Sequence, residues 1–135
     1  MKISTWGVIA LSGVLLAGCS SNSEREKTLE MIATNRAALL ASELPLEYGP
    51  LHIMRANAKG STIEMMMVYN NSAPNAKSTQ EVLTNSEKAF CNNTTIMENL
   101  TTGISYRIKM RDSRGTLLVD QLITQETCDK HKKSK

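Results

Sequence analysis

A short apolar stretch that ends at Cys19 sets the boundary of the part of this chain that can fold. Lys2 supplies a positive charge, residues 6–17 are mostly apolar, and residues 16–19 read Leu-Ala-Gly-Cys. A positive start, an apolar run and small residues in that order are typical of a secretory signal. The run is shorter than the roughly 20 residues of a membrane-spanning helix. The polar residues that follow argue against a buried helix of a cytosolic protein.

Residues 16–19 also resemble a lipobox. In bacterial lipoproteins this motif implies diacylglycerol on the thiol, here that of Cys19, cleavage before it, and acylation of the new amino group. Several acyl chains make such an anchor durable, whereas one chain binds only marginally. Ser20 follows the cysteine, and by resemblance to lipoprotein sorting the absence of Asp there favours the outer membrane. We therefore expect outer-membrane lipid and the lipoprotein sorting machinery as partners, with the domain facing the periplasm.

These features divide the chain into four parts. We expect a signal peptide over 1–18, a lipidated spacer over 19–23, one folded domain over 24–128 and a basic tail over 129–135. The 16 Lys and Arg residues exceed the 13 Asp and Glu residues, and the tail holds four of the lysines. The excess charge therefore lies in the tail, and no basic face for nucleic acid is predicted. The tail is either a solvated end or a contact for anionic lipid head groups.

Two cysteines remain once Cys19 is lipidated, and these are Cys91 and Cys128. An even number of thiols in an oxidising compartment predicts a disulfide. The alternative is a pair of free or metal-binding thiols. Since His52 and His131 are the only histidines, they would complete a poor zinc site, and no metal or cofactor is expected.

Hydrophobic periodicity predicts two helices and four strands. Leu29, Ala33, Leu40 and their neighbours keep a helical period between Ser23, a candidate N-cap, and Pro45, so a helix is expected over 24–43. A membrane-surface helix is less favoured because this apolar face is rich in Ala and lacks aromatic residues. The other predicted elements are strands over 51–57 and 62–69, a helix from the cap at Ser78 to Cys91, and strands over 104–111 and 116–124.

The strand over 62–69 carries apolar side chains on both faces, so it is expected to lie inside the sheet rather than at an edge. The strand over 104–111 alternates apolar and polar residues, as a strand with one buried face does. We therefore predict an α+β fold of mixed α/β type, with a largely antiparallel sheet of four to five strands and helices packed on one face.

No pattern of catalytic residues emerges, and the protein is not expected to be an enzyme. Methionine is the one residue type in excess, because Met65, Met66 and Met67 place sulfur on both faces of one strand. Methionine fills irregular gaps in cores and also suits adaptable binding surfaces. We consider core filling first and a partner-binding groove second. The candidate partner-binding residues are Met65, Met66, Met67, Leu29, Arg36 and Leu40.

Several short motifs occur in an order that resembles one family. They are the lipobox, ASELPL at 41–46, KGST at 59–62, MMM at 65–67, FC at 90–91, GISY at 103–106, and a hairpin at Asp112 followed by TC at 127–128. This order resembles the AspS, or GspS-beta, type of pilotin lipoprotein from type II secretion systems, over most of residues 29–128.

The resemblance implies a job without catalysis. Such pilotins bind the C-terminal segment of secretin subunits and direct these subunits to the outer membrane, where the secretin assembles. It also implies the lipid on Cys19, the Cys91–Cys128 disulfide, and a sheet with helices on one side. The competing interpretations are a small periplasmic inhibitor or adhesin-like lipoprotein and a lipid-anchored hydrolase.

Overall fold

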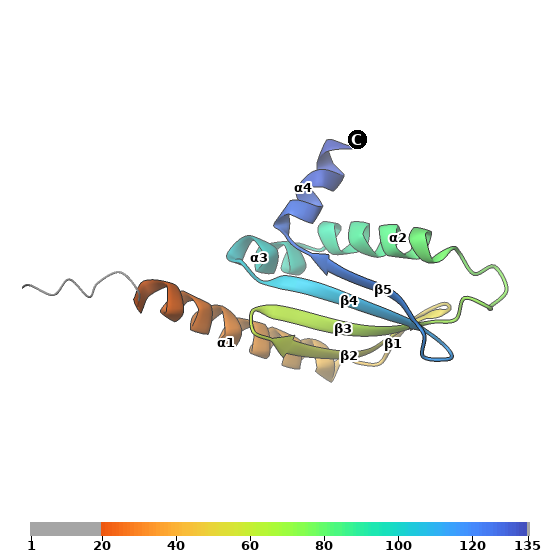
Figure 1. The fold of residues 1–135 in the computed structure, drawn as a ribbon, viewed down its shortest axis with the longest axis horizontal. Coiled ribbons are helices and arrows are strands. Elements are labelled where there is room, and N and C mark those ends of the chain that lie inside the picture. Colours follow the sequence, from red (N-terminus) through yellow and green to blue (C-terminus); the bar gives the residue numbers. More distant parts are fainter. Residues whose placement is uncertain (1–19, 135) are drawn as a thin grey trace, which may run out of the picture.

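The computed structural model describes residues 20–134, so the expected signal peptide and Cys19 lie outside the described residues. Figure 1 shows a long N-terminal helix, a twisted sheet and further helices. The elements in chain order are α1 (Ser20–Ser42), β1 (Leu46–Tyr48), β2 (Leu51–Lys59), β3 (Thr62–Tyr69), α2 (Thr79–Asn92), α3 (Thr94–Thr102), β4 (Ser105–Asp112), β5 (Leu117–Ile123) and α4 (Gln125–Lys133).

The sheet has five strands in the order of the sequence. Neighbouring strands are antiparallel except β3 and β4, which are parallel. A parallel pair needs a crossover connection, and α2 and α3 provide it. The predicted interior position of the strand over 62–69 is confirmed, because β3 is the third of the five strands.

The core lies on one face of this sheet, and the helices cover that face. Along β3 the buried residues alternate with half-buried ones, and β4 repeats the pattern. The resulting core cluster combines side chains from β3 and β4 with Ala33 and Ala37 of α1 and with Val82 and Phe90 of α2. Figure 1 shows α1 running beside β2 and β3, while α2 lies beside β5. The predicted fold class is confirmed.

The opposite face of the sheet is open and carries charged side chains. Arg107 donates to both carboxylate oxygens of Asp120, at 2.6 and 2.9 Å. Glu64 lies 3.4 Å from the ammonium of Lys59 and 3.5 Å from that of Lys109. Ion pairs on a solvent-facing surface contribute little to stability. They keep this face polar, in contrast to the covered one.

The first helix begins earlier than the sequence indicates. Residues 20–23, which we expected as part of a polar spacer, form the first turn of α1, so the N-cap assigned to Ser23 is wrong. The helix ends at Ser42, and Pro45 follows as predicted. Residues such as Ser and Asn favour helix interiors weakly, which is why the sequence places the start too late.

Three elements are absent from the predicted two helices and four strands: β1, α3 and α4. β1 is a three-residue edge strand that pairs with β2, and so short a segment shows no periodicity. α4 continues through residues 129–133 of the expected tail. At its start, the backbone N–H of Thr124 donates to the Thr127 hydroxyl at 3.1 Å, and Cys128 is fully buried. Local capping and one buried cysteine therefore stabilise α4, whose mostly charged sequence shows no apolar face.

Candidate partner-binding groove

An apolar groove opens on the covered face of the sheet, between α1 and α2. It encloses about 810 Å³. One wall is lined by side chains of α1, which are Arg36, Leu39, Leu40 and Glu43. Positions i, i+3, i+4 and i+7 lie on one face of a helix, and this face adjoins the one that packs Ala33 and Ala37 into the core.

The opposite wall comes from α2 and the start of α3. Ser78 caps α2 by accepting a hydrogen bond from the backbone N–H of Glu81. The cap fixes where the helix begins, and the residues that follow present one face to the groove. These residues are Val82, Asn85, Ser86, Ala89, Phe90 and Asn93.

The floor consists of side chains from β2, β3 and β4. Met65 and Met67 alternate with residues of the open face, so both sulfurs point to the groove side. Phe90 of α2 meets Tyr106 of β4 edge to face, with ring centroids 5.6 Å apart. Leu39 on α1 and Tyr48 on β1 line the mouth and are 61% and 60% exposed. Large apolar side chains exposed beside an apolar groove are candidates for contact with a partner.

One polar spot interrupts the apolar lining. The side-chain amide of Asn99 donates to the Tyr106 hydroxyl at 2.7 Å, and both residues are buried. Burial raises the pKa of Tyr106 above its ordinary value of 10.0, against smaller lowering effects from the Asn99 hydrogen bond and the positive charge of Arg36. The hydroxyl is therefore neutral at physiological pH and lies within the field of Arg36.

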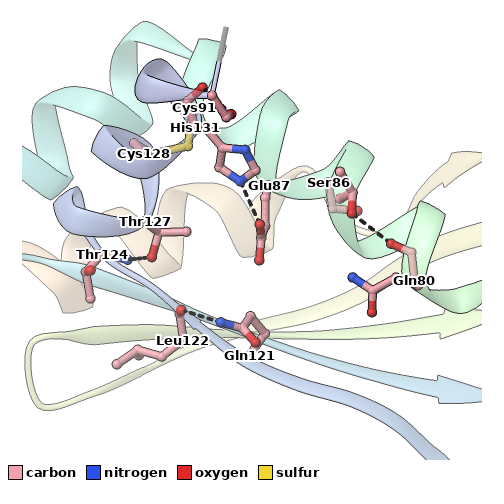
Figure 2. Close-up of polar contacts among 12 residues, drawn as sticks. Gln80, Ser86, Glu87, Cys91, Gln121, Leu122, Thr124, Thr127, Cys128 and His131 are labelled. Carbon is pink, nitrogen blue, oxygen red and sulfur yellow. Dashed lines mark hydrogen bonds and ion pairs between the residues drawn. A yellow bond between two sulfur atoms is a disulfide. The ribbon is translucent and has the colours of Figure 1, made fainter.

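A second region joins α2 to α4. Cys91 and Cys128 form a disulfide with Cα atoms 5.4 Å apart, as expected. One turn before Cys91, Glu87 lies 2.7 Å from the ring nitrogen of His131 (Figure 2). A polar hollow of about 270 Å³ adjoins this pair. The disulfide and the Glu87–His131 contact thus hold the two helices together at neighbouring points.

Within residues 20–134, no group of His, Cys, Asp and Glu side chains could hold a metal ion. No helix of that part of the chain is long and apolar enough to cross a membrane.

Comparison with known proteins identifies the family. The family described as "Type II secretion system (T2SS) pilotin, S protein" matches residues 25–128. The chain belongs to this family.

Solved structures of two pilotins share the fold and much of the sequence. The type II secretion system pilotin AspS from Vibrio cholerae is 57% identical, covers 79% of this chain and 98% of its own, and has a TM-score of 0.75. The pilotin EpsS from the Vibrio vulnificus type 2 secretion system is 45% identical, covers 79% and 97%, and has the same TM-score. Among curated proteins, "Pilotin AspS 2" of Escherichia coli O78:H11 is 25% identical over 84% of this chain and 82% of its own.

Four of the six candidate partner-binding residues lie together in this pilotin. Met65, Met67, Arg36 and Leu40 line the groove. Met66 lies on the open face, where its sulfur is 3.6 Å from the guanidinium of Arg55. Leu29 packs against the core and is not among the groove-lining residues.

The α2 wall was not anticipated from sequence. Positions 82, 86 and 89 follow a helical period, but this period predicts only that α2 packs on something. Because the period does not say whether a face meets the sheet or an open groove, the sequence held no signal for this wall.

Proposed function

We propose that this pilotin binds the C-terminal segment of type II secretin subunits in the groove between α1 and α2 and directs the subunits to the outer membrane. The observation that carries the proposal is an open apolar groove, with exposed Leu39 and Tyr48 at its mouth, in a chain of the pilotin family. The same proposal makes the protein a targeting factor rather than an enzyme, with no cofactor and no nucleic-acid partner.

The shape of the groove favours a helical occupant. Its walls are the side chains of two helices, and its floor is the side chains of a sheet. An α-helix is about 10–12 Å across with its side chains, and an amphipathic helix binds such grooves through apolar residues spaced three and four apart. The bound segment would then complete the helical layer over β3.

An extended segment is the second candidate. β5 ends the sheet and pairs only with β4 among the described strands. A partner strand could add to such an edge through main-chain hydrogen bonds. It would bind at β5 and leave the groove unfilled, so variants in the groove separate the two modes.

Location follows from the lipid that we propose on Cys19. Acylation and sorting would hold the pilotin on the periplasmic face of the outer membrane. A tethered pilotin raises the local concentration of the secretin subunits that it carries. The lipid thus determines where the pilotin is delivered, and the groove binds the secretin subunit that is delivered with it. A lipoprotein inhibitor with the same anchor remains the alternative function.

The first test is calorimetric titration of the unlipidated chain, residues 19–135 with Cys19→Ala, with a peptide from the C-terminus of the secretin of the same organism. We predict that Ala89→Trp weakens binding at least tenfold, because the indole fills the groove from the α2 wall. Lys88→Trp, its exposed neighbour outside the groove lining, is the matched control and should bind normally. Equal binding by both variants would favour the β5 edge.

The second test is in cells. Secretin multimers should be lost from the outer membrane in a strain that lacks this pilotin. If the peptide does not bind and the multimers still reach the outer membrane, the pilotin interpretation fails and the inhibitor-like alternative replaces it.

A further inference from the structure

The charged side chains that line the groove are Arg36 and Glu43 from α1 and Lys77 from the loop before α2. Lys77 already has a partner, since its ammonium lies 3.3 Å from Glu81. Within residues 20–134, neither Arg36 nor Glu43 forms an ion pair. Of the two, Arg36 is the one whose charge acts on Tyr106, the polar group of the groove. The groove therefore offers a cation that no carboxylate of the described chain neutralises.

A second donor lines the same groove. The oxygen of Tyr106 accepts from Asn99, and no acceptor for the Tyr106 hydrogen is found in the described part of the chain. Tyr106 is 3% exposed, yet it lines the groove together with Arg36. The positive charge of Arg36 lowers the pKa of Tyr106, although less than burial raises it, so the two groups lie within electrostatic range across the groove.

An occupant with only apolar side chains would fit these groups poorly. It would cover the guanidinium of Arg36, which is exposed in the free protein, and would leave the already buried Tyr106 hydrogen without an acceptor. Leaving such donors unsatisfied is unfavourable. A carboxylate satisfies both. Its two oxygens match the donor fork of arginine, and one of them can also accept from a hydroxyl.

We propose that the groove selects a secretin segment whose buried side carries an Asp or Glu side chain, and that this carboxylate binds Arg36 and accepts a hydrogen bond from Tyr106. This inference rests on the proposed function and adds a specificity-determining contact to it. Glu43 lies two turns further along α1, about 10.5 Å away. The groove thus carries opposite charges at two points, and a segment with an acid and a base about seven residues apart fits in one direction only.

The experiment is a charge-reversal cycle on the unlipidated chain, residues 19–135 with Cys19→Ala, and a secretin C-terminal peptide. Arg36→Glu should weaken binding about tenfold, since charge pairs at interfaces are coupled by this much or more. Arg114→Glu makes the same change of charge in the β4–β5 turn and should bind as the parent chain does. A peptide in which the acidic residue is replaced by Lys should bind Arg36→Glu better than it binds the parent.

A second arm separates a side-chain carboxylate from the terminal one. Amidating the C-terminus of the peptide should leave the dissociation constant unchanged, whereas replacing its acidic side chain by the amide should weaken binding. The reverse pattern would overturn the assignment to a side chain.

The outcomes also separate this inference from the proposed function. Binding that Arg36→Glu leaves intact, or a secretin segment with no acidic side chain, would overturn the inference alone. Absence of binding to the parent chain would overturn both.

Discussion

The Asn99–Tyr106 pair is the one place where this core buries polar side chains against each other. Asn99 is the only buried polar residue among those described, and its partner comes from the neighbouring β4. Buried polar groups are stable only when their hydrogen bonds are made. The pair therefore fixes how α3 sits on the sheet, and its hydroxyl gives the groove a polar point.

Tyr106→Phe should lower the free energy of unfolding by about 1–3 kcal/mol at neutral pH, because the Asn99 amide loses its buried acceptor. Chemical denaturation at pH 8 measures this loss. Tyr106→Leu would also remove the ring contact with Phe90, so it should be less stable than Tyr106→Phe. A Phe variant as stable as the parent would show that Asn99 finds another partner.

The same residue predicts a pH dependence. Burial raises the folded-state pKa of Tyr106 above 10.0, so the folded protein holds this proton more tightly than the unfolded chain does. The resulting contribution to stability is complete below pH 10 and is lost as the pH rises through the folded pKa. Between pH 8 and pH 11 the parent should lose more stability than Tyr106→Phe. Parallel decreases in the two proteins would contradict the assignment.

No sequence pattern could reveal this pair. The spacing of seven residues between Asn99 and Tyr106 is not a contact rule for a helix followed by a strand, and the bond exists only because α3 packs over β4. The cysteines were different, because compartment and number alone predicted that Cys91 and Cys128 would pair. A disulfide can thus be predicted from the number of cysteines and an oxidising compartment, whereas a buried hydrogen bond that depends on tertiary packing cannot.

At the level of elements, hydrophobic periodicity predicted the four long strands of the sheet but missed the short edge strand β1 and the C-terminal helix α4. The apolar residues on both faces of β3 predicted its interior position, and the alternation of apolar and polar residues along β4 predicted its buried face. Three residues of β1 cannot show a period. In α4 the basic residues 130–133 look like a solvated tail, and the sequence before them shows no apolar helical period. Elements that depend on tertiary contacts are therefore the ones that hydrophobic periodicity fails to predict.

The Cys91–Cys128 disulfide is the contact that we expect to hold α4. Replacing both cysteines by Ser should lower the free energy of unfolding by about 2–5 kcal/mol, the usual range for a small secreted domain. Amide hydrogen exchange should become faster in α4 before it does so in β3 and β4, because the contacts of α4 with α2, α3 and β5 are much less extensive than those between neighbouring strands. His131→Ala, which removes the neighbouring contact with Glu87, is the milder comparison. A melting curve that reduction leaves unchanged would show that packing alone retains the helix.

At the scale of the whole molecule, the fold connects the proposed lipid anchor to the proposed partner-binding groove, which the sequence indicates only as separate features. The groove combines a helix face near residue 40, a strand near residue 65 and a second helix near residue 85, and no local pattern unites these segments. Sequence predicted Arg36, Leu40, Met65 and Met67 as candidates, but it could not show that α2 forms the facing wall. Moreover, α1 is both a wall of the groove and the element that begins directly after Cys19. The proposed lipid anchor is therefore joined to the binding wall without an intervening loop in the described chain.

Although α1 joins the anchor to the groove, the two depend on different residues and can be tested by separate mutations. Cys19→Ala removes the proposed acyl acceptor and leaves every described groove-lining residue in place, so the affinity for the secretin peptide should stay unchanged. Membrane fractionation should show the variant released from the outer membrane, and secretin multimers should be lost there as in a deletion strain. Ala89→Trp should give the converse result, with normal fractionation and lost delivery. If Cys19→Ala still incorporated acyl label and stayed in the outer-membrane fraction, the anchor would lie elsewhere. If it were released but still delivered secretin, binding alone would suffice, and the division of work between lipid and groove would be wrong.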